Sequence, residues 1–200
     1  MQPEKEFRRL SMGFNIAIDG PAGAGKSTIA RRTAQELSFI YVDTGALYRA
    51  LAVFLVDEGI SPEETEKVGE AVKSVKVSIA YENGEQQVLV NGKNVTSRLR
   101  AEAVGNMASK VSAIPAVRAA LLDLQRDLAK AHDVLMDGRD IGTNVLPEAE
   151  LKIYLTASVE TRAERRYKEL QEKGEKKDFS AIKEEIEKRD YQDMTRAIAP

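Results

Sequence analysis

The segment from Gly20 to Ser27, read G-P-A-G-A-G-K-S, constrains the fold more than any other feature of this chain. It matches G-x-x-x-x-G-K-[S/T], in which the backbone N–H groups of a glycine-rich turn point inward at phosphate oxygens. An apolar run at 14–18 precedes it and a helical pattern over 26–37 follows, so the turn joins a buried strand to a helix. A lysine at a helix start, where the dipole disfavours cations, indicates that an anion offsets it.

The rest of the chain repeats this strand-helix alternation. A second strand is predicted at 39–42 with a helix running to Gly59, and buried strands follow at 134–137 and 151–156, so we expect a parallel sheet between helices. The Ser61-Pro62 pair predicts the start of a short helix reaching the low 70s. Alternating apolar residues over 75–96, broken by two Asn-Gly pairs, predict an inserted three-stranded antiparallel meander. Helices are expected again at 101–111, at 115–131 and twice between 160 and 196.

Composition excludes several classes of protein. Two hundred residues favour one compact body. Lys plus Arg number 30 and Asp plus Glu 32, a net charge of −2, which argues against a general nucleic-acid or anionic-membrane binder. The absence of cysteine excludes disulfides and thiolate sites, and no apolar run approaches a membrane span. We therefore expect a cytoplasmic protein with no nucleic-acid or membrane partner.

Other motifs narrow the choice among proteins with a phosphate-binding loop. The guanine-reading N-K-x-D motif is absent, and the larger ATPases and motors need more length. A small-molecule kinase needs a second pocket that binds an anion. The candidate cations for this pocket are Arg49, Arg139, Arg189 and Arg196. The ordinary alternative for any one of them is a solvated surface arginine.

Three further stretches are more specific than the loop: D-T-G-A-L-Y-R (43–49), D-G-R-D-I-G-T (137–143), and R-D with Asp193, Arg196 and Ala-Pro (189–200). In these stretches the chain resembles bacterial cytidylate kinases, which are P-loop nucleoside monophosphate kinases. The resemblance runs from about residue 14 to 200. It implies transfer of a phosphoryl group from ATP to CMP or dCMP, with Mg²⁺ as cofactor, nucleotides as the partners and a monomeric state.

The resemblance also implies a domain organisation within an α/β fold. We expect a tail at 1–11, a three-layer P-loop kinase core at 12–59 and 121–200 with a helical lid at about 160–189, and an inserted nucleotide-binding lobe at 60–120 whose hairpins span about 75–96. Family members continue past Pro200 with a last strand and a terminal helix, so we expect the core sheet of this chain to be one strand short.

Residue roles carried over by motif position fall into four groups. The catalytic set is Lys26, Arg139, Arg189 and Arg162. The ATP set is Gly20, Pro21, Ala22, Gly23, Ala24, Gly25, Lys26, Ser27 and Thr28 with the lid residues Arg165 and Arg166. The CMP set is Thr44, Arg49, Ser109, Arg118, Arg139, Asp140, Asp193 and Arg196. The Mg²⁺ set is Ser27 and, through water, Asp137.

The expected base preference follows from hydrogen bonding. Cytosine presents an N4 amino donor beside acceptors at N3 and O2, so a carboxylate and a guanidinium complement it. The resemblance assigns these to Asp140 and Arg118. Uracil has an acceptor at position 4, which would face Asp140 with repulsion, so we predict that CMP is preferred to UMP.

Several alternatives stay open at this stage. Asp137 either holds Mg²⁺ through water or only positions the following turn. Arg162, Arg165 and Arg166 share a helix face at i, i+3, i+4 spacing and either close over ATP or form a salt-bridged solvent face. In the same way Ser109 and Arg118 could only face water, and Asp193 could only pair with Arg196. The alternative functions are a kinase for another small acceptor and a nucleotide-binding regulator without turnover.

Overall fold

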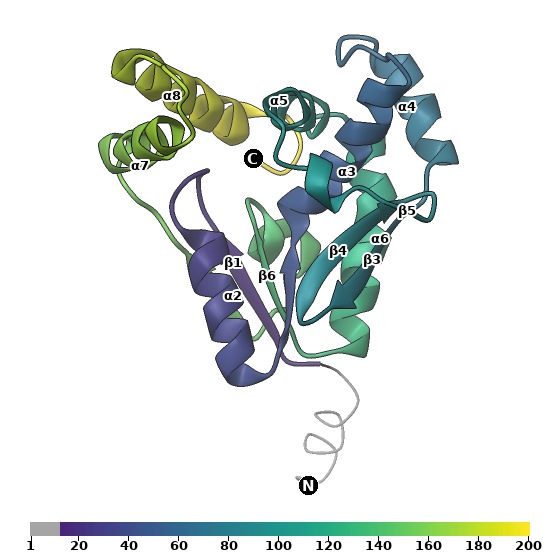
Figure 1. Ribbon diagram of the computed structural model, residues 1–200. Helices are drawn as coiled ribbons and strands as arrows, with labels where there is room; N and C mark the ends of the chain where they lie inside the picture. The colour runs from purple at the N-terminus through teal and green to yellow at the C-terminus, as the bar shows by residue number, and fades with distance from the viewer. Residues whose placement is uncertain (1–12) are drawn as a thin grey trace, which may run out of the picture.

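The computed structural model describes residues 13–200, and its centre is a four-stranded parallel sheet (Figure 1). The strands are β1 (Asn15–Asp19), β2 (Ile40–Asp43), β6 (Val134–Gly138) and β7 (Leu151–Tyr154), in the spatial order β2-β6-β1-β7. Asp43 is in register with Asp137, and Asp19 with Gly138. Three acids therefore end neighbouring strands at one edge of the sheet, where open α/β sheets bind ligands. The expected tail at 1–11 lies outside the described residues.

Helices cover both faces of the sheet, which confirms the predicted three-layer α/β core. Ile16 and Ile18 of β1 pack with α2 (Lys26–Leu37) on one face. Ala17, between them, points to the other face, where α6 (Pro115–Ala131) contributes Ala129. This alternation along β1 is the two-residue period of a strand buried on both sides. Next to α6 lies α3 (Thr44–Asp57), which follows β2 directly.

The inserted meander forms as predicted. Strands β3 (Val77–Glu82), β4 (Glu85–Val90) and β5 (Lys93–Asn94) are antiparallel neighbours. Asn83 and Gly84 have φ of 53° and 78°, the left-handed pair that a two-residue hairpin of this twist requires. The sheet packs with α3, α4 (Thr65–Ser74), α5 (Glu102–Val111) and α6 around one large apolar cluster, to which Val95 and Leu99, on either side of the short helix η1 (Thr96–Arg98), also contribute.

The C-terminal part is a pair of helices, α7 (Val159–Glu172) and α8 (Phe179–Thr195), which confirms the two helices predicted between 160 and 196. The pair has its own small core, in which Ala163 and Leu170 meet Ile182. Between β6 and β7 the chain makes a single wide turn, η2 (Ile141–Val145). Among residues 13–200 no helix combines the length and the apolar character that crossing a membrane requires.

Two expectations about elements were wrong. The helix predicted to start at Ser61 begins at Thr65, because Ser61 and Pro62 form a separate turn in which the Glu64 carboxylate accepts the Ser61 N–H at 3.0 Å. The strand predicted to be buried at 151–156 is exposed: Leu151, Ile153 and Tyr154 keep 44%, 39% and 68% of their surface. Within the described residues β7 is an edge strand with one neighbour, so its apolar side chains are not covered.

Candidate functional site

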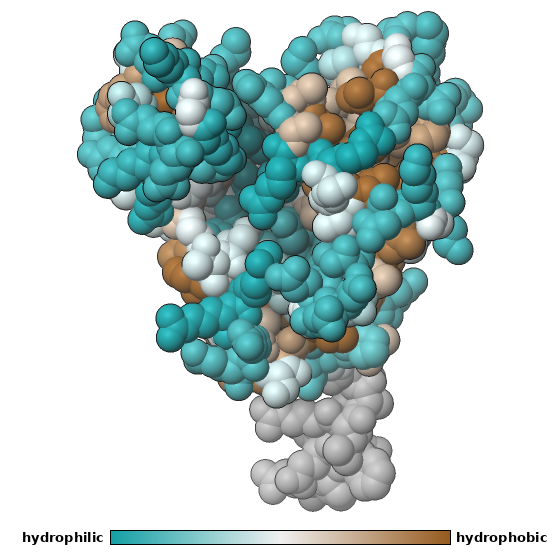
Figure 2. Space-filling view, in the orientation of Figure 1, coloured by the Kyte–Doolittle hydropathy of each residue, from teal (hydrophilic) through white to brown (hydrophobic). Residues whose placement is uncertain are grey.

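A cleft of about 700 Å³ lies above the carboxyl ends of the strands, between the α7–α8 pair and the lobe of α3 and α5. Figure 2 shows this hollow between a largely hydrophilic body on the left and a body on the right whose surface mixes hydrophilic and hydrophobic residues. Most of the residues expected in the site line it: Ala22, Gly23, Ala24, Gly25, Lys26, Ser27, Thr28, Thr44, Arg49, Ser109, Arg118, Asp137, Arg139, Asp140, Arg165, Arg189, Asp193 and Arg196. Gly20, Pro21, Arg162 and Arg166 do not line it.

The glycine-rich turn forms the floor of the cleft on the α2 side. Gly20, Gly23 and Gly25 have φ of 144°, 76° and 98°, a backbone course that residues with a Cβ rarely adopt. At Gly20 there is also no room for a side chain, because an added Cβ would lie 1.9 Å from the Leu155 carbonyl oxygen. The turn therefore keeps its shape only with glycine.

Lys26 is almost fully buried at the start of α2, and its Nζ donates to the Pro21 carbonyl oxygen at 2.8 Å. Burial, and secondly the positive charge of Arg139, lower the pKa of Lys26 to about 7. The charges of Asp137 and Asp19 act in the opposite direction. A phosphate anion beside Nζ would favour the charged ammonium form again.

A hydroxyl and a carboxylate meet beside the loop. Ser27 Oγ donates to Asp137 Oδ2 at 2.8 Å, and the Tyr41 hydroxyl donates to Asp137 Oδ1 at 3.0 Å. Burial, and secondly the charge of Asp43, raise the pKa of Asp137. The main chain of Asp137 also accepts the Thr44 hydroxyl at 2.7 Å. Two hard oxygen ligands thus lie together in a buried acidic corner of the cleft.

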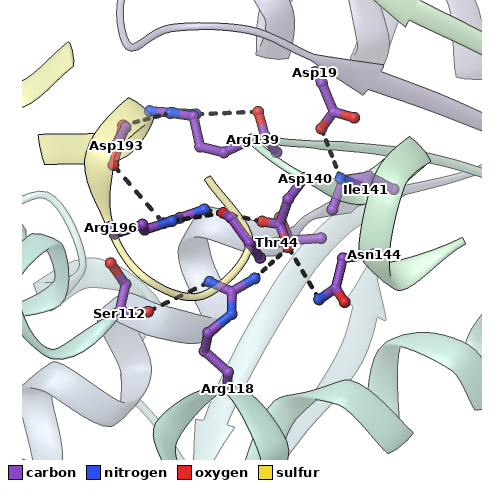
Figure 3. A network of polar contacts seen from close by, with 12 residues as sticks. Asp19, Thr44, Ser112, Arg118, Arg139, Asp140, Ile141, Asn144, Asp193 and Arg196 are labelled. Atoms are coloured by element: carbon purple, nitrogen blue, oxygen red, sulfur yellow. Dashed lines mark hydrogen bonds and ion pairs between the residues drawn. The ribbon is translucent and has the colours of Figure 1, made fainter. Parts of the chain in front are cut away.

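At the opposite end of the cleft Asp140 lies between two arginines (Figure 3). Arg118 forms a buried ion pair with Asp140 Oδ2, and Arg196 donates to Asp140 Oδ1 at 3.3 Å. Arg118 reaches the cleft from α6 and lies over the Tyr48 ring, 5.7 Å from its centroid. The carboxylate orients both guanidinium groups, and Asn144 adds a donor to Oδ2 at 3.2 Å.

Cations gather between these two ends. Arg139 donates to Asp193 at 3.1 Å and to the Gly138 carbonyl oxygen at 3.2 Å, whereas the buried Nε of Arg189 has no hydrogen-bond partner in the part of the chain that the structure describes. Burial, and secondly the charge of Arg139, lower the pKa of Arg189. Arg49 also lines this region, from the first turns of α3. Like charges held this close favour an anion among them.

The three arginines of α7 that share a helix face by their spacing have three different surroundings in the structure. Arg165 lines the cleft and donates to the Gly23 carbonyl oxygen at 3.2 Å. Arg162 is buried behind the loop and pairs with Asp190. Arg166 is exposed and pairs with Glu169 at 3.0 Å. On a helix of 3.6 residues per turn Arg165 lies about 60° to one side of Arg162 and Arg166 about 40° to the other, and the neighbouring α8 buries only Arg162.

Ser109 lines the cleft from α5. Its backbone carbonyl oxygen accepts the Gln192 amide of α8 at 3.1 Å and the Ser112 hydroxyl at 2.8 Å. This leaves the Ser109 side chain on the cleft wall. The Gln192 contact links α5 with α8 across the cleft.

Sequence reasoning missed several residues that shape or line the cleft, among them Asp19 and Arg100. Asp19 is buried and accepts the N–H groups of Ile141 and Gly142, each at 2.8 Å, which fixes the turn after Asp140. The sequence could have indicated Asp19, because it lies at the end of a buried strand just as Asp137 does. Arg100 lines the mouth of the cleft from an irregular segment, where no pattern distinguishes it from other exposed arginines.

The comparisons with known proteins agree with this geometry. The model of the cytidylate kinase family matches residues 16–200. A cytidylate kinase of Caldicellulosiruptor saccharolyticus is 50% identical over 94% of this chain and 83% of its own length. Those of Lactobacillus gasseri and Magnetococcus marinus are 46% and 47% identical, over 96% and 94% of this chain and 83% of their own lengths. With a phosphate-binding loop at one end of its cleft and a carboxylate between two arginines at the other, this chain belongs to the cytidylate kinase family.

Proposed function

We propose that this protein transfers the terminal phosphoryl group of ATP to CMP or dCMP, releasing ADP and CDP or dCDP. The observation that carries the proposal is that one cleft joins two different anion sites. The glycine-rich loop with Lys26 forms one, and Arg49, Arg139 and Arg196 form the other, beside the Asp140 carboxylate. Family membership supports the same reaction.

The donor end suits a triphosphate. The N–H groups of the glycine-rich turn and the N-terminus of α2 provide a cradle for phosphate oxygens. Lys26 would neutralise the β and γ phosphates, and Arg165 would approach from the lid side, where it already contacts the loop at Gly23. Thr28, in the first turn of α2, lines the same part of the cleft.

The acceptor end suits a pyrimidine monophosphate. Arg49, Arg139 and Arg196 would bind its phosphate, since planar guanidinium groups match phosphate oxygens in pairs. Asp193 lies one helical turn before Arg196 and would accept from the ribose. The base would lie against Asp140, Arg118 and Ser109, where one acceptor site of Asp140, on Oδ1, is left for the N4 amino group of cytosine.

Transfer itself needs little covalent work from the protein. Negative charge spreads over the oxygens of the moving phosphoryl group, so catalysis rests on alignment and on fixed positive charge. Arg139 and Arg189 both line the cleft, and the buried Nε of Arg189 provides a donor with no partner among the described residues. We assign these two arginines to the transferred group.

Ser27 and Asp137 fit the needs of Mg²⁺, which prefers hydroxyl, carboxylate and water oxygens and is held largely by substrate phosphates in such enzymes. When bound, the ion would neutralise phosphate charge and orient the oxygens. We propose that Ser27 contacts it directly and that Asp137 holds it through water. In the described residues no three acidic or histidine side chains cluster as a protein-only metal site, in keeping with an ion shared with the nucleotide.

The metal role predicts a specific kinetic change in Asp137→Asn. Loss of the charge should raise the Mg²⁺ concentration for half-maximal rate by about 10-fold or more, as for other residues that act on a metal through water. The measurement is initial rate against free Mg²⁺ at saturating nucleotide. An unchanged rate and an unchanged Mg²⁺ requirement would leave Asp137 with only the positioning of the Gly138 turn.

The function as a whole is tested by a coupled assay of ADP release with CMP, dCMP, UMP, AMP and GMP as acceptors. Rapid release with CMP or dCMP is expected. Faster release with another acceptor would assign a different substrate. No release with any acceptor would overturn the proposal and indicate a protein that binds nucleotides without turnover.

A further inference from the structure

The Arg162 guanidinium lies at a junction of three segments rather than in the cleft. It donates to the Ala22 carbonyl oxygen of the glycine-rich loop at 3.2 Å and to the Ala157 carbonyl oxygen, just before α7, at 3.0 Å. Both oxygens of Asp190 on α8 accept from it, at 2.9 and 2.5 Å. Its side chain is 3% exposed and that of Asp190 is 16% exposed.

Little of this guanidinium remains for a substrate. An arginine has five N–H donors, and four of those of Arg162 are used by protein oxygens. Arg165, one turn further along α7, differs on both counts: it is exposed, and it lines the cleft with a single bond to Gly23. The two arginines are therefore equipped for different tasks.

Asp190 connects this junction to the centre of the cleft. Its neighbour Arg189 lines the cleft, and consecutive residues leave a helix about 100° apart, so fixing Asp190 on Arg162 also fixes the direction of Arg189. Asp193, which holds Arg139, follows one turn later on the same helix. The rotation of α8 thus determines where these charged groups of the cleft lie.

We propose that Arg162 and Asp190 are positioning residues, which fix the α7–α8 pair against the glycine-rich loop and so aim Arg189 into the cleft, and that Arg165 is the arginine of α7 that contacts the ATP phosphates. The kinetic part of this inference rests on the proposed function. The structural part does not, and the two are tested separately.

The structural test uses the absence of cysteine from the chain. Spin labels on Gln35→Cys of α2 and Lys168→Cys of α7, both exposed positions, report the distance between the loop helix and the lid by pulsed electron paramagnetic resonance. A narrow distance distribution is expected, and Asp190→Asn should broaden or shift it. Lys183→Met is the matched control, because Lys183 joins α8 to Glu160 of α7 by an exposed ion pair at 2.7 Å. An unchanged distribution in Asp190→Asn, or equal broadening in the control, would overturn the positioning role.

The kinetic test is a double-mutant cycle. The same contact is broken in Arg162→Met, in Asp190→Asn and in the double variant. Each single variant should lower kcat about 10- to 100-fold, because Arg189 is displaced. The double variant should lower kcat no more than the worse single variant. Arg165→Met should lower kcat/KM for ATP without changing the distance distribution.

If Arg162→Met loses far more kcat than Asp190→Asn while the lid stays docked, Arg162 acts on the phosphates and the proposal is wrong. If the wild-type protein shows no turnover, only the proposed function is overturned. The distance measurement still decides whether the Arg162–Asp190 contact fixes α7 and α8 against the loop.

Discussion

At the scale of single residues, the charge of Lys26 depends on what lies beside it. The group is buried at a helix N-terminus, and Arg139 adds to the cost of its charge, so its pKa falls from 10.5 to about 7. At pH 8.5 the free protein therefore holds Lys26 mostly neutral. A bound triphosphate raises the pKa again, and binding must then take up a proton.

This linkage predicts that ATP binding takes up about one proton at pH 8.5 and much less at pH 6, where Lys26 is already charged. The measurement is isothermal titration calorimetry in buffers of different ionisation enthalpy. In Lys26→Met the uptake at pH 8.5 should disappear along with much of the affinity. Equal uptake in the variant and the wild type would place the titrating group elsewhere.

The sequence predicted most cleft residues because they lie in short, ordered motifs. Residues 22–28 of the glycine-rich segment, Thr44, Arg49 and the Arg139-Asp140 pair line the cleft. Arg162 could not be placed in this way. Whether an arginine on a charged helix is buried depends on the acid that faces it, and Asp190 is 28 residues away on another helix. Local spacing does not contain that information.

At the scale of elements, turns with glycine at positive φ were the most predictable features, because only backbone sterics decide them. Both Asn-Gly pairs turn as expected. The predicted start of α4 and the predicted burial of β7 were wrong. The start of α4 depends on the separate turn at Ser61 and Pro62, which the Glu64 carboxylate closes. The burial of β7 depends on which strand lies at the edge of the sheet. Apolar composition alone does not distinguish an edge strand from a central one.

The loop between β1 and α2 gives a prediction about folding stability. Gly20→Ala should lower the free energy of unfolding by roughly 4 kcal/mol or more, because the new Cβ meets the Leu155 carbonyl oxygen in addition to an unfavourable φ. Gly59→Ala is the control: its φ is 67° with nothing within 4 Å of the Cβ, so only about 1–2 kcal/mol is expected. Urea unfolding measures both. Similar losses in the two variants would show that the contact with Leu155 does not constrain the loop.

At the scale of the whole molecule, the two walls of the cleft differ in how they are held. The wall formed by α3 and α5 shares the largest apolar cluster, which includes Leu47 and Leu51. The other wall, α7 and α8, has a small cluster of its own around Leu170 and Ile182. Local opening free energy follows the apolar contacts that an element shares with the rest of the fold. The lid pair should therefore be the part that moves.

Native-state hydrogen exchange tests this difference. Amides of α7 should exchange through an opening that needs less free energy than global unfolding, whereas amides in the middle of α3 should exchange only with global unfolding. Asp190→Asn should lower the opening free energy of α7 and leave α3 unchanged. The same opening free energy for both helices in the wild type would contradict a separately held lid.

Base discrimination tests the central claim most directly. The measurement is kcat/KM for CMP and for UMP with the wild type, with Asp140→Asn and with Asp193→Asn as the control. In the proposed pose Asp140 would face an amino group in cytosine and a carbonyl in uracil, so the wild type should favour CMP by at least about 100-fold, and Asp140→Asn should remove most of that ratio. Asp193→Asn should slow both substrates and keep the ratio. Equal turnover of CMP and UMP by the wild type, or a ratio that Asp140→Asn leaves unchanged, would contradict the account.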